Sequence, residues 1–218
     1  MEQKAGNEYQ QKTKEELFEE KLKVAEKRLD KQGVEMDTKI IDTVAILNLY
    51  QIPTSGSCEG HIDHGIANPW VNLKAVGEPE ERFVGEKATK QSIGDQFHIS
   101  PDEVGRGQNE EANIRFWDTI GAVEKTPEYR KWMADNEKLA KTMSALIDEF
   151  YTGGKPDPLV AINLLTLGGI AGRIQSGPDE IPSKNLNPAE ESALRIRLSK
   201  RQEEMKRFTE FLKKRMVI

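Results

Sequence analysis

Residues 159–177 read LVAINLLTLGGIAGRIQSG, and this stretch decides the fold class. The apolar run before Gly168 is short and bounded by turn residues, which indicates a buried strand. Gly168-Gly169 predicts a hairpin turn into a second strand, IAGRIQSG. The stretch therefore predicts an antiparallel strand pair in the C-terminal third of the chain.

Long amphipathic helices are expected on both sides of this pair. Thr126 and Pro127 form a helix start, and Gly153-Gly154 ends the helix that follows. Asn187 and Pro188 open a last helix. Each helix carries a heptad-like apolar stripe, made of Tyr129, Trp132, Leu139, Met143, Leu146 and Phe150 in the first and of Leu194, Leu198, Met205, Phe208 and Leu212 in the last.

The N-terminal third predicts two helices and a second strand pair. Phe18, Leu22, Ala25 and Leu29 form one helical stripe that Gly33 ends. Asp37 or Thr38 is expected to cap the second helix, and Pro53 ends it. Strands are expected at 54–58 and 70–76, paired antiparallel. We expect residues 1–13 to be disordered.

Residues 77–107 are rich in glycine, proline and charge, and are expected to form a long connection. Within it, Ser100–Glu103 has the form of a capping box that opens one short helix. Arg106 lies in a G-R-G sequence that suits either a phosphate contact or a flexible loop. Trp117 is expected in the core.

This order of elements predicts a single α+β domain over residues 1–218, with a small antiparallel sheet packed against several long amphipathic helices. An alternative is that the terminal helices pair with each other as an antiparallel coiled arm. The heptad-like stripes also allow a homo-oligomer.

Composition excludes several classes of protein. The chain has 218 residues, a net charge of −5 and one cysteine, so it has no intramolecular disulfide. It contains no apolar run of membrane-spanning length and begins with a polar segment, so a cytoplasmic protein is expected. Its acidic charge gives no signal of nucleic-acid binding. Motifs of P-loop, Rossmann, zincin and nucleophile-elbow enzymes are absent.

One segment gathers reactive residue types. Residues 54–64 read TSGSCEGHIDH and hold the only cysteine, two histidines and two carboxylates. The first hypothesis is a site for a small polar or nucleotide-like ligand at the Ser57–His64 loop. In that hypothesis Cys58, Glu59 and His61 are catalytic or contact residues, because a neighbouring imidazole activates a thiol. Further ligand contacts are expected from Thr54, Ser55, Ser57, Gly60 and Arg173.

Two other interpretations of this segment stay open. Cys58, His61 and His64 have the residue types and close spacing of metal ligands, with Asp63 or Glu59 as an oxygen donor. Alternatively the loop is structural, and the protein is a non-enzymatic helical interaction protein. Arg173 is assigned as an anion clamp on the condition that its strand lies beside Thr54–Cys58. The sequence leaves open whether any reaction is catalysed and with which cofactor.

The same segment resembles two families. The motif SCEGH, followed by PWV, is similar to a family of uncharacterised bacterial and phage proteins without an assigned activity. TSGSCEGHI also resembles the motif TTSSCSGRI of the third wybutosine-synthesis protein family. That family methylates a modified guanosine of tRNA with S-adenosylmethionine. Thr54, Ser57, Cys58, Gly60 and Ile62 match its motif, whereas His61 stands where the family has arginine.

Overall fold

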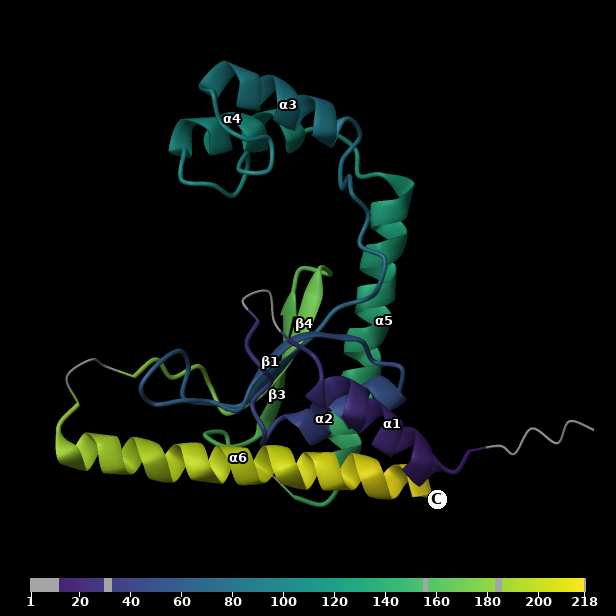
Figure 1. Cartoon of the computed structure of the whole chain (residues 1–218), viewed down its shortest axis with the longest axis vertical. Coiled ribbons are helices and arrows are strands. Elements are labelled where there is room, and N and C mark those ends of the chain that lie inside the picture. The colour runs from purple at the N-terminus through teal and green to yellow at the C-terminus, as the bar shows by residue number, and fades with distance from the viewer. Residues whose placement is uncertain (1–11, 30–32, 155–156, 183–185, 218) are drawn as a thin grey trace, which may run out of the picture. The chain divides into compact units, whose positions relative to one another are not determined.

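The structure is a computed structural model, and it describes residues 12–29, 33–154, 157–182 and 186–217. Over these residues it contains six helices and one four-stranded sheet, which confirms the α+β class (Figure 1). The helices are α1 (Lys14–Glu26), α2 (Ile41–Leu49), α3 (Glu86–Phe97), α4 (Glu110–Ile120), α5 (Pro127–Phe150) and α6 (Pro188–Val217), and the strands are β1 (Thr54–Cys58), β2 (Trp70–Leu73), β3 (Ile162–Leu167) and β4 (Ala171–Ser176).

The chain divides into two compact units, although the sequence suggests one domain. The first unit runs to Lys74 and resumes at Leu139, and it holds the sheet with α1, α2 and α6. The second unit is Ala75–Lys138 and holds α3 and α4. Helix α5 contributes its first half to the second unit and its second half to the first. Most of residues 1–13 lie outside the described residues.

The sheet has the order β1-β2-β4-β3, with every neighbouring pair antiparallel. Both predicted hairpin pairs form, and Gly168-Gly169 takes positive φ angles at the turn. The central pairing of β2 with β4 joins the two hairpins, with Val71 opposite Ile174. Strand β2 thus lies between β1 and the strand that carries Arg173, so the condition set for Arg173 is not met.

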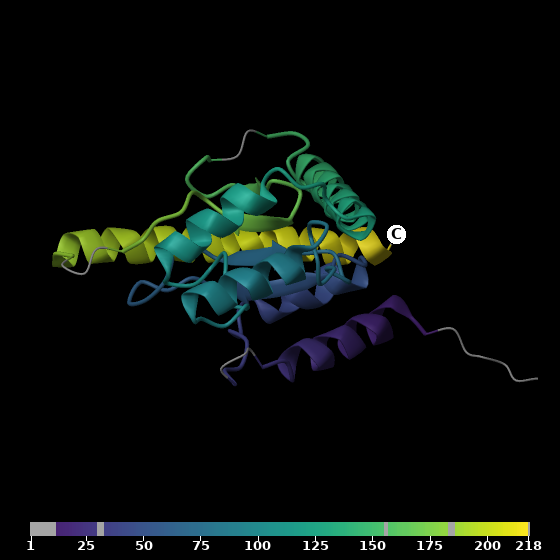
Figure 2. The same ribbon diagram turned by 90° about the horizontal axis from the view of Figure 1, so that it is seen from above.

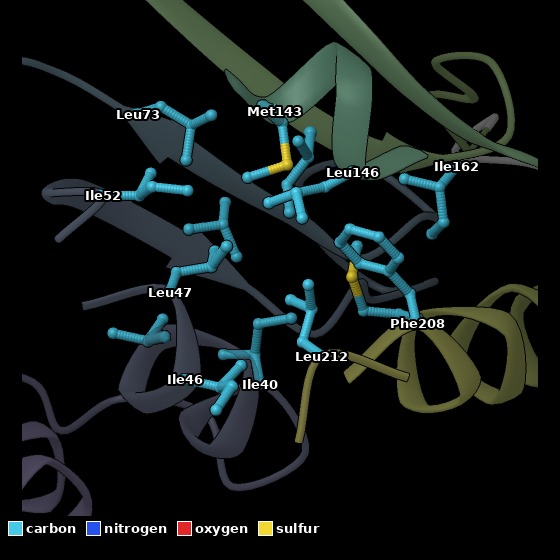
Figure 3. Packing of buried hydrophobic residues seen from close by; sticks show 14 of the residues in the cluster. Ile40, Ile46, Leu47, Ile52, Leu73, Met143, Leu146, Ile162, Phe208 and Leu212 are labelled. Atoms are coloured by element: carbon cyan, nitrogen blue, oxygen red, sulfur yellow. The ribbon is translucent and has the colours of Figure 1, made fainter. Parts of the chain in front are cut away.

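One face of the sheet forms the core of the first unit. Val71, Leu73 and Ile174 are buried, whereas Trp70 and Arg173, which alternate with them, stay partly exposed. Figure 3 shows the buried side chains from α2, α5, α6 and the sheet pointing toward one another. The apolar stripes of α5 and α6 supply Met143, Leu146, Phe208 and Leu212 to this core. These four stripe residues are therefore buried within a single chain, and are not exposed for contact with a second copy.

Helix boundaries follow the predicted caps where a side chain makes the cap. The Thr126 hydroxyl accepts a hydrogen bond from the Tyr129 amide at 3.1 Å, and Asn187 Oδ1 accepts from the amides of Ala189 and Glu190 at 3.0 Å. Helix α6 then runs as one uninterrupted helix in both views (Figures 1 and 2).

Helix α1 is shorter than its apolar stripe suggests. It ends at Glu26, and Leu29 is exposed and bridges to Glu35 instead. At the start of α2 the cap residue is Ile40, without a side-chain cap. The predicted caps of α2, Asp37 and Thr38, are therefore wrong.

The second unit contains a helix that was not predicted from the sequence. Residues 77–107, expected to be a connection, hold the 12-residue helix α3, whereas Ser100–Glu103 form turns rather than the start of a helix. Phe116 of α4 packs with Ile93 and Val104 in a separate apolar cluster. Trp117 is 44% exposed, because it follows Phe116 and so points away from that cluster. The expectation that Trp117 is core is wrong.

A buried arginine ties three segments of the first unit together. Arg201 of α6 is 1% exposed, and it donates hydrogen bonds to the carbonyl oxygens of Leu159 and Ala67 and to the Glu180 carboxylate at 2.8–3.0 Å. The ion pair and carbonyl acceptors compensate the cost of removing this cation from water. Gly177, with φ +74°, lies against the guanidinium.

We predict that Gly177→Ala destabilises the first unit far more than Gly168→Ala does. A Cβ at Gly177 would lie 2.5 Å from Arg201 Nε and would also overlap the Leu159 carbonyl, whereas a Cβ at Gly168 meets nothing within 4 Å. Both glycines have positive φ, so Gly168→Ala should cost only the backbone strain of about 1 kcal/mol. Gly177→Ala should cost about 3 kcal/mol because overlap is added. Urea unfolding of both variants measures the difference, and equal losses would contradict the packing described for Arg201.

Candidate functional site

The candidate site begins where β1 ends and the chain turns sharply. The register of β1 on β2 shifts between Thr54 and Gly56, and beyond this bulge Cys58 lies opposite Trp70. The turn follows at Gly60, whose φ of +85° favours glycine. A Cβ there would come within 2.8 Å of the Asn68 backbone and of Leu198 Cδ1. The tight packing at Gly60 fixes the direction in which His61 leaves the strand.

A residue from a distant segment completes the site. Asp37 lies just before α2, and its Oδ2 accepts a hydrogen bond from the Glu59 amide at 3.0 Å and lies 3.2 Å from His61 Nε2. One ligand atom each of Asp37, Cys58 and His61 lie within 4.8 Å of one another, and all three residues are partly buried. A carboxylate oxygen, a sulfur and an imidazole nitrogen therefore converge on one point.

The electrostatics of this cluster disfavour a free thiolate. Burial raises the pKa of the Cys58 thiol most, and the carboxylates of Asp37 and Glu59 raise it further, to about 11, against the hydrogen bond from the Gly60 amide. For Asp37, burial alone would raise the pKa, but hydrogen bonds from the Glu59 amide and His61 hold it below its usual value. A thiol with this pKa is protonated at neutral pH and is a weak nucleophile.

The contacts of Glu59 are structural rather than catalytic in this arrangement. Its carboxylate accepts a hydrogen bond from the Lys39 amide at 3.1 Å, and its carbonyl oxygen accepts from Gln202 Nε2 at 2.9 Å. These contacts tie the turn after β1 to the segment before α2 and to α6. Glu59 is thus placed as a residue that holds Asp37 and Cys58 in position.

The other expected ligand contacts are dispersed. Thr54 is buried, and its hydroxyl accepts from Asn48 Nδ2 at 3.2 Å, whereas Ser55 is exposed and Ser57 is partly buried. Gly60 is enclosed by protein atoms, as described above. None of the five best-formed cavities among the described residues is lined by Cys58, Glu59 or His61.

His64 belongs to a second, more exposed group. Its imidazole stacks on that of His61, with the ring centroids 4.2 Å apart, and its Nδ1 lies 2.9 Å from Asp63 Oδ1. The ligand atoms of His61, Asp63 and His64 also lie within 4.8 Å of one another. The structure therefore groups His64 with Asp63 and His61, and it groups Cys58 with Asp37 and His61.

Arg173 occupies the same face of the sheet as Trp70. Its guanidinium carbon lies 4.4 Å from the centre of the Trp70 ring, and its Nε donates to Asn72 Oδ1 at 2.9 Å. The Trp70 ring also lies over Gly56, where a Cβ would be 3.7 Å from its Cζ3, in ordinary van der Waals contact. This arrangement holds Arg173 on the sheet even though β2 separates it from β1.

Sequence reasoning missed Asp37 as a site residue. Asp37 stands 21 positions before Cys58, and its position just before an apolar helix made it look like a helix cap. The only signal in the sequence was that Asp37 is an acidic residue in a polar segment. Nothing in that segment indicates that the fold brings it near the turn after β1. No local spacing carries that information.

Comparisons of the chain with protein-family models, with curated proteins and with solved structures found no match. The two resemblances, one of SCEGH with PWV and one of TSGSCEGHI, therefore remain predictions. In the part of the chain that the structure describes, no helix is both long enough and apolar enough to cross a membrane.

We predict that Cys58 of the folded, chelator-treated protein reacts slowly with iodoacetamide. Only the thiolate is alkylated, and a pKa near 11 leaves very little of it at pH 7, so the rate should be at least about tenfold below that of the urea-unfolded chain. Plotted against pH, the alkylation rate of the unfolded chain should show an inflection near the ordinary thiol pKa of 9.0. The rate for the folded protein should show no inflection below pH 10.

Asp37→Asn is the matched variant for this experiment. It removes a carboxylate that raises the Cys58 pKa, so its alkylation profile should move to lower pH. If the alkylation rate of the folded wild-type protein shows an inflection at or below pH 9, the environment assigned to Cys58 is wrong.

Proposed function

We propose that this protein binds a divalent transition-metal ion, with zinc as the best match, through Asp37, Cys58 and His61. The observation that carries the proposal is the convergence of one oxygen, one sulfur and one nitrogen donor within 4.8 Å, from two segments of the chain. Zinc accepts all three donor types, and its catalytic sites commonly combine three protein ligands with one open position.

The donor spacing supports this proposal. Zinc lies about 2.0–2.3 Å from nitrogen, oxygen and sulfur ligands, so neighbouring ligand atoms in a tetrahedral site are about 3–4 Å apart. The 3.2 Å between His61 Nε2 and Asp37 Oδ2 falls in this range. Small side-chain movements suffice to bring the Cys58 sulfur to the same distance.

Backbone hydrogen bonds around the donors also favour a metal. The Gly60 amide donates to Cys58 Sγ at 3.3 Å, and the Glu59 amide donates to Asp37 Oδ2. Such bonds orient ligands and stabilise a thiolate once a cation displaces its proton. The carboxylates that oppose a free thiolate at Cys58 attract a cation to the same point.

We predict that the purified protein binds Co²⁺ and exchanges it for Zn²⁺. A tetrahedral site with a cysteine ligand gives a thiolate-to-cobalt charge-transfer band and intense visible bands. Cys58→Ser should abolish the charge-transfer band, and Asp37→Asn and His61→Ala should each weaken binding at least about a hundredfold, since loss of an outer partner alone costs about 10–100-fold.

His64→Ala is the matched control, because it removes an imidazole only a few residues from His61. It should leave the affinity within about twofold of wild type. If His64→Ala abolishes binding while Asp37→Asn does not, the ligand set is the other group of His61, Asp63 and His64. If no variant binds differently from wild type, the proposal is wrong.

A second candidate function is binding of a small polar or nucleotide-like ligand on the sheet face beside Cys58. The stacking of Arg173 on Trp70 favours it, because a guanidinium held in this way is preorganised to bind an anionic group. The register supports the same face, since Cys58 lies opposite Trp70.

We predict that any binding of S-adenosylmethionine or guanosine monophosphate, measured by equilibrium dialysis, weakens about tenfold in Arg173→Gln. Arg195→Gln is the control, because Arg195 is exposed on α6 and pairs only with Glu191 among the described residues. Absence of binding by both compounds, or equal binding by both variants, would count against this second candidate.

A further inference from the structure

The second unit contains a polar cavity that the proposed metal centre does not use. Its volume is about 270 Å³. Three basic side chains line it, Arg82, Lys90 and Arg106, and the indole of Trp117 forms part of its wall. Two arginines, a lysine and an aromatic ring around one small cavity form a suitable lining for an anionic group attached to a ring.

The floor of the cavity is fixed by a buried carboxylate. Glu86 is 1% exposed and accepts hydrogen bonds from the Arg82 amide at 2.6 Å and from Arg82 Nη2 at 2.6 Å, and Lys90 Nζ lies 2.9 Å from its Oε1. Burial alone would raise the pKa of Glu86, but these partners outweigh it and lower the pKa to about 2. One carboxylate therefore holds two cations rigidly, and the trio keeps a net positive charge.

The wall of the cavity is formed by the segment that contains Arg106. Arg106 Nε donates to the Asp102 carbonyl oxygen at 2.9 Å, which positions its guanidinium. Trp117 Nε1 donates to the Gly105 carbonyl oxygen at 3.2 Å, and the Arg82 guanidinium carbon lies 5.5 Å from the Trp117 ring centre. The half-exposed indole is thus held in place by polar contacts.

Backbone amides of this segment do not supply the anion contacts. The amide of Gly105 donates to Asn113 Oδ1, and the amides of Arg106 and Gly107 donate to the Glu103 carbonyl oxygen. An anion would therefore be held by side chains. This differs from a glycine-rich phosphate loop, in which main-chain N–H groups bind the phosphate.

The charge balance around the cavity allows an anion. Glu78 and Glu80 also line it, together with Glu86. The lining thus has three cations and three carboxylates, but Glu80 is neutralised by an ion pair with Lys87, which does not line the cavity. With Lys87 counted, the groups around the cavity carry one net positive charge.

We propose that this cavity binds a small phosphate monoester whose organic group carries a ring. The phosphate would be held by Arg106, Arg82 and Lys90, and the ring would lie against Trp117. The proposal is independent of the metal centre, because it uses other residues in the other unit.

Calorimetry with phenyl phosphate as the probe tests this proposal, with a chelator present so that the metal centre plays no part. Phenyl phosphate should bind to the full chain. Arg106→Gln should weaken this binding about tenfold, since it removes a charge-assisted hydrogen bond. Arg115→Gln, an exposed arginine of α4 that does not line the cavity, should leave it unchanged.

The contribution of the ring is tested with a second variant and a second probe. Trp117→Leu should weaken binding of phenyl phosphate several-fold more than binding of inorganic phosphate, because loss of the contacts with Gly105 and Arg82 affects both probes and loss of the ring contact affects only phenyl phosphate. Circular dichroism checks that each variant is folded, and both substituted side chains are exposed. The proposal is overturned if phenyl phosphate does not bind, if Arg106→Gln binds it as tightly as Arg115→Gln does, or if benzylamine binds in its place.

Discussion

The pairing of β2 with β4 is the contact on which the first unit depends. It joins two hairpins that are separated by about a hundred residues, and it places Val71 opposite Ile174 in the core. Local pairing alone would leave each hairpin with an uncovered apolar face. Joined into one sheet, they bury that face against α2, α5 and α6 (Figure 3). Closing so long a loop is costly in entropy, so this pairing should form late in folding.

The sequence predicted those features that local residue types determine. The β3–β4 hairpin and the caps at Thr126 and Asn187 are confirmed, because a glycine pair or a side-chain cap sets each of them within a few residues; the β1–β2 pair is also confirmed, although a longer segment joins its strands. The order of the strands was not predicted, since it depends on contacts between distant segments. Helix α3 was missed because its only strongly buried aliphatic side chain is Ile93, and its buried carboxylate, Glu86, looked like a surface charge.

The candidate site shows the same limit. The loop after β1 was recognised from its cysteine and histidines, yet the third converging group, Asp37, comes from a segment before α2. In the Asp37 cluster an acidic side chain organises groups from a distant segment, whereas in the Arg82–Glu86–Lys90 trio the partners stand four residues before and after the carboxylate. A carboxylate taken from water needs donors around it: Asp37 finds them in the turn after β1, and Glu86 finds them within four residues of itself.

The bulge in β1 determines which side chain of this strand lies opposite Trp70. The extra residue between Thr54 and Gly56 offsets the alternation by one position and brings Cys58 opposite Trp70. If the same residues paired without the bulge, Ser55 would lie opposite Asn72 and Ser57 opposite Trp70, so a hydroxyl would take the place of the sulfur. The bulge thus decides whether a soft sulfur or a hard hydroxyl oxygen lies at this position of the sheet, which are donors that suit different metals.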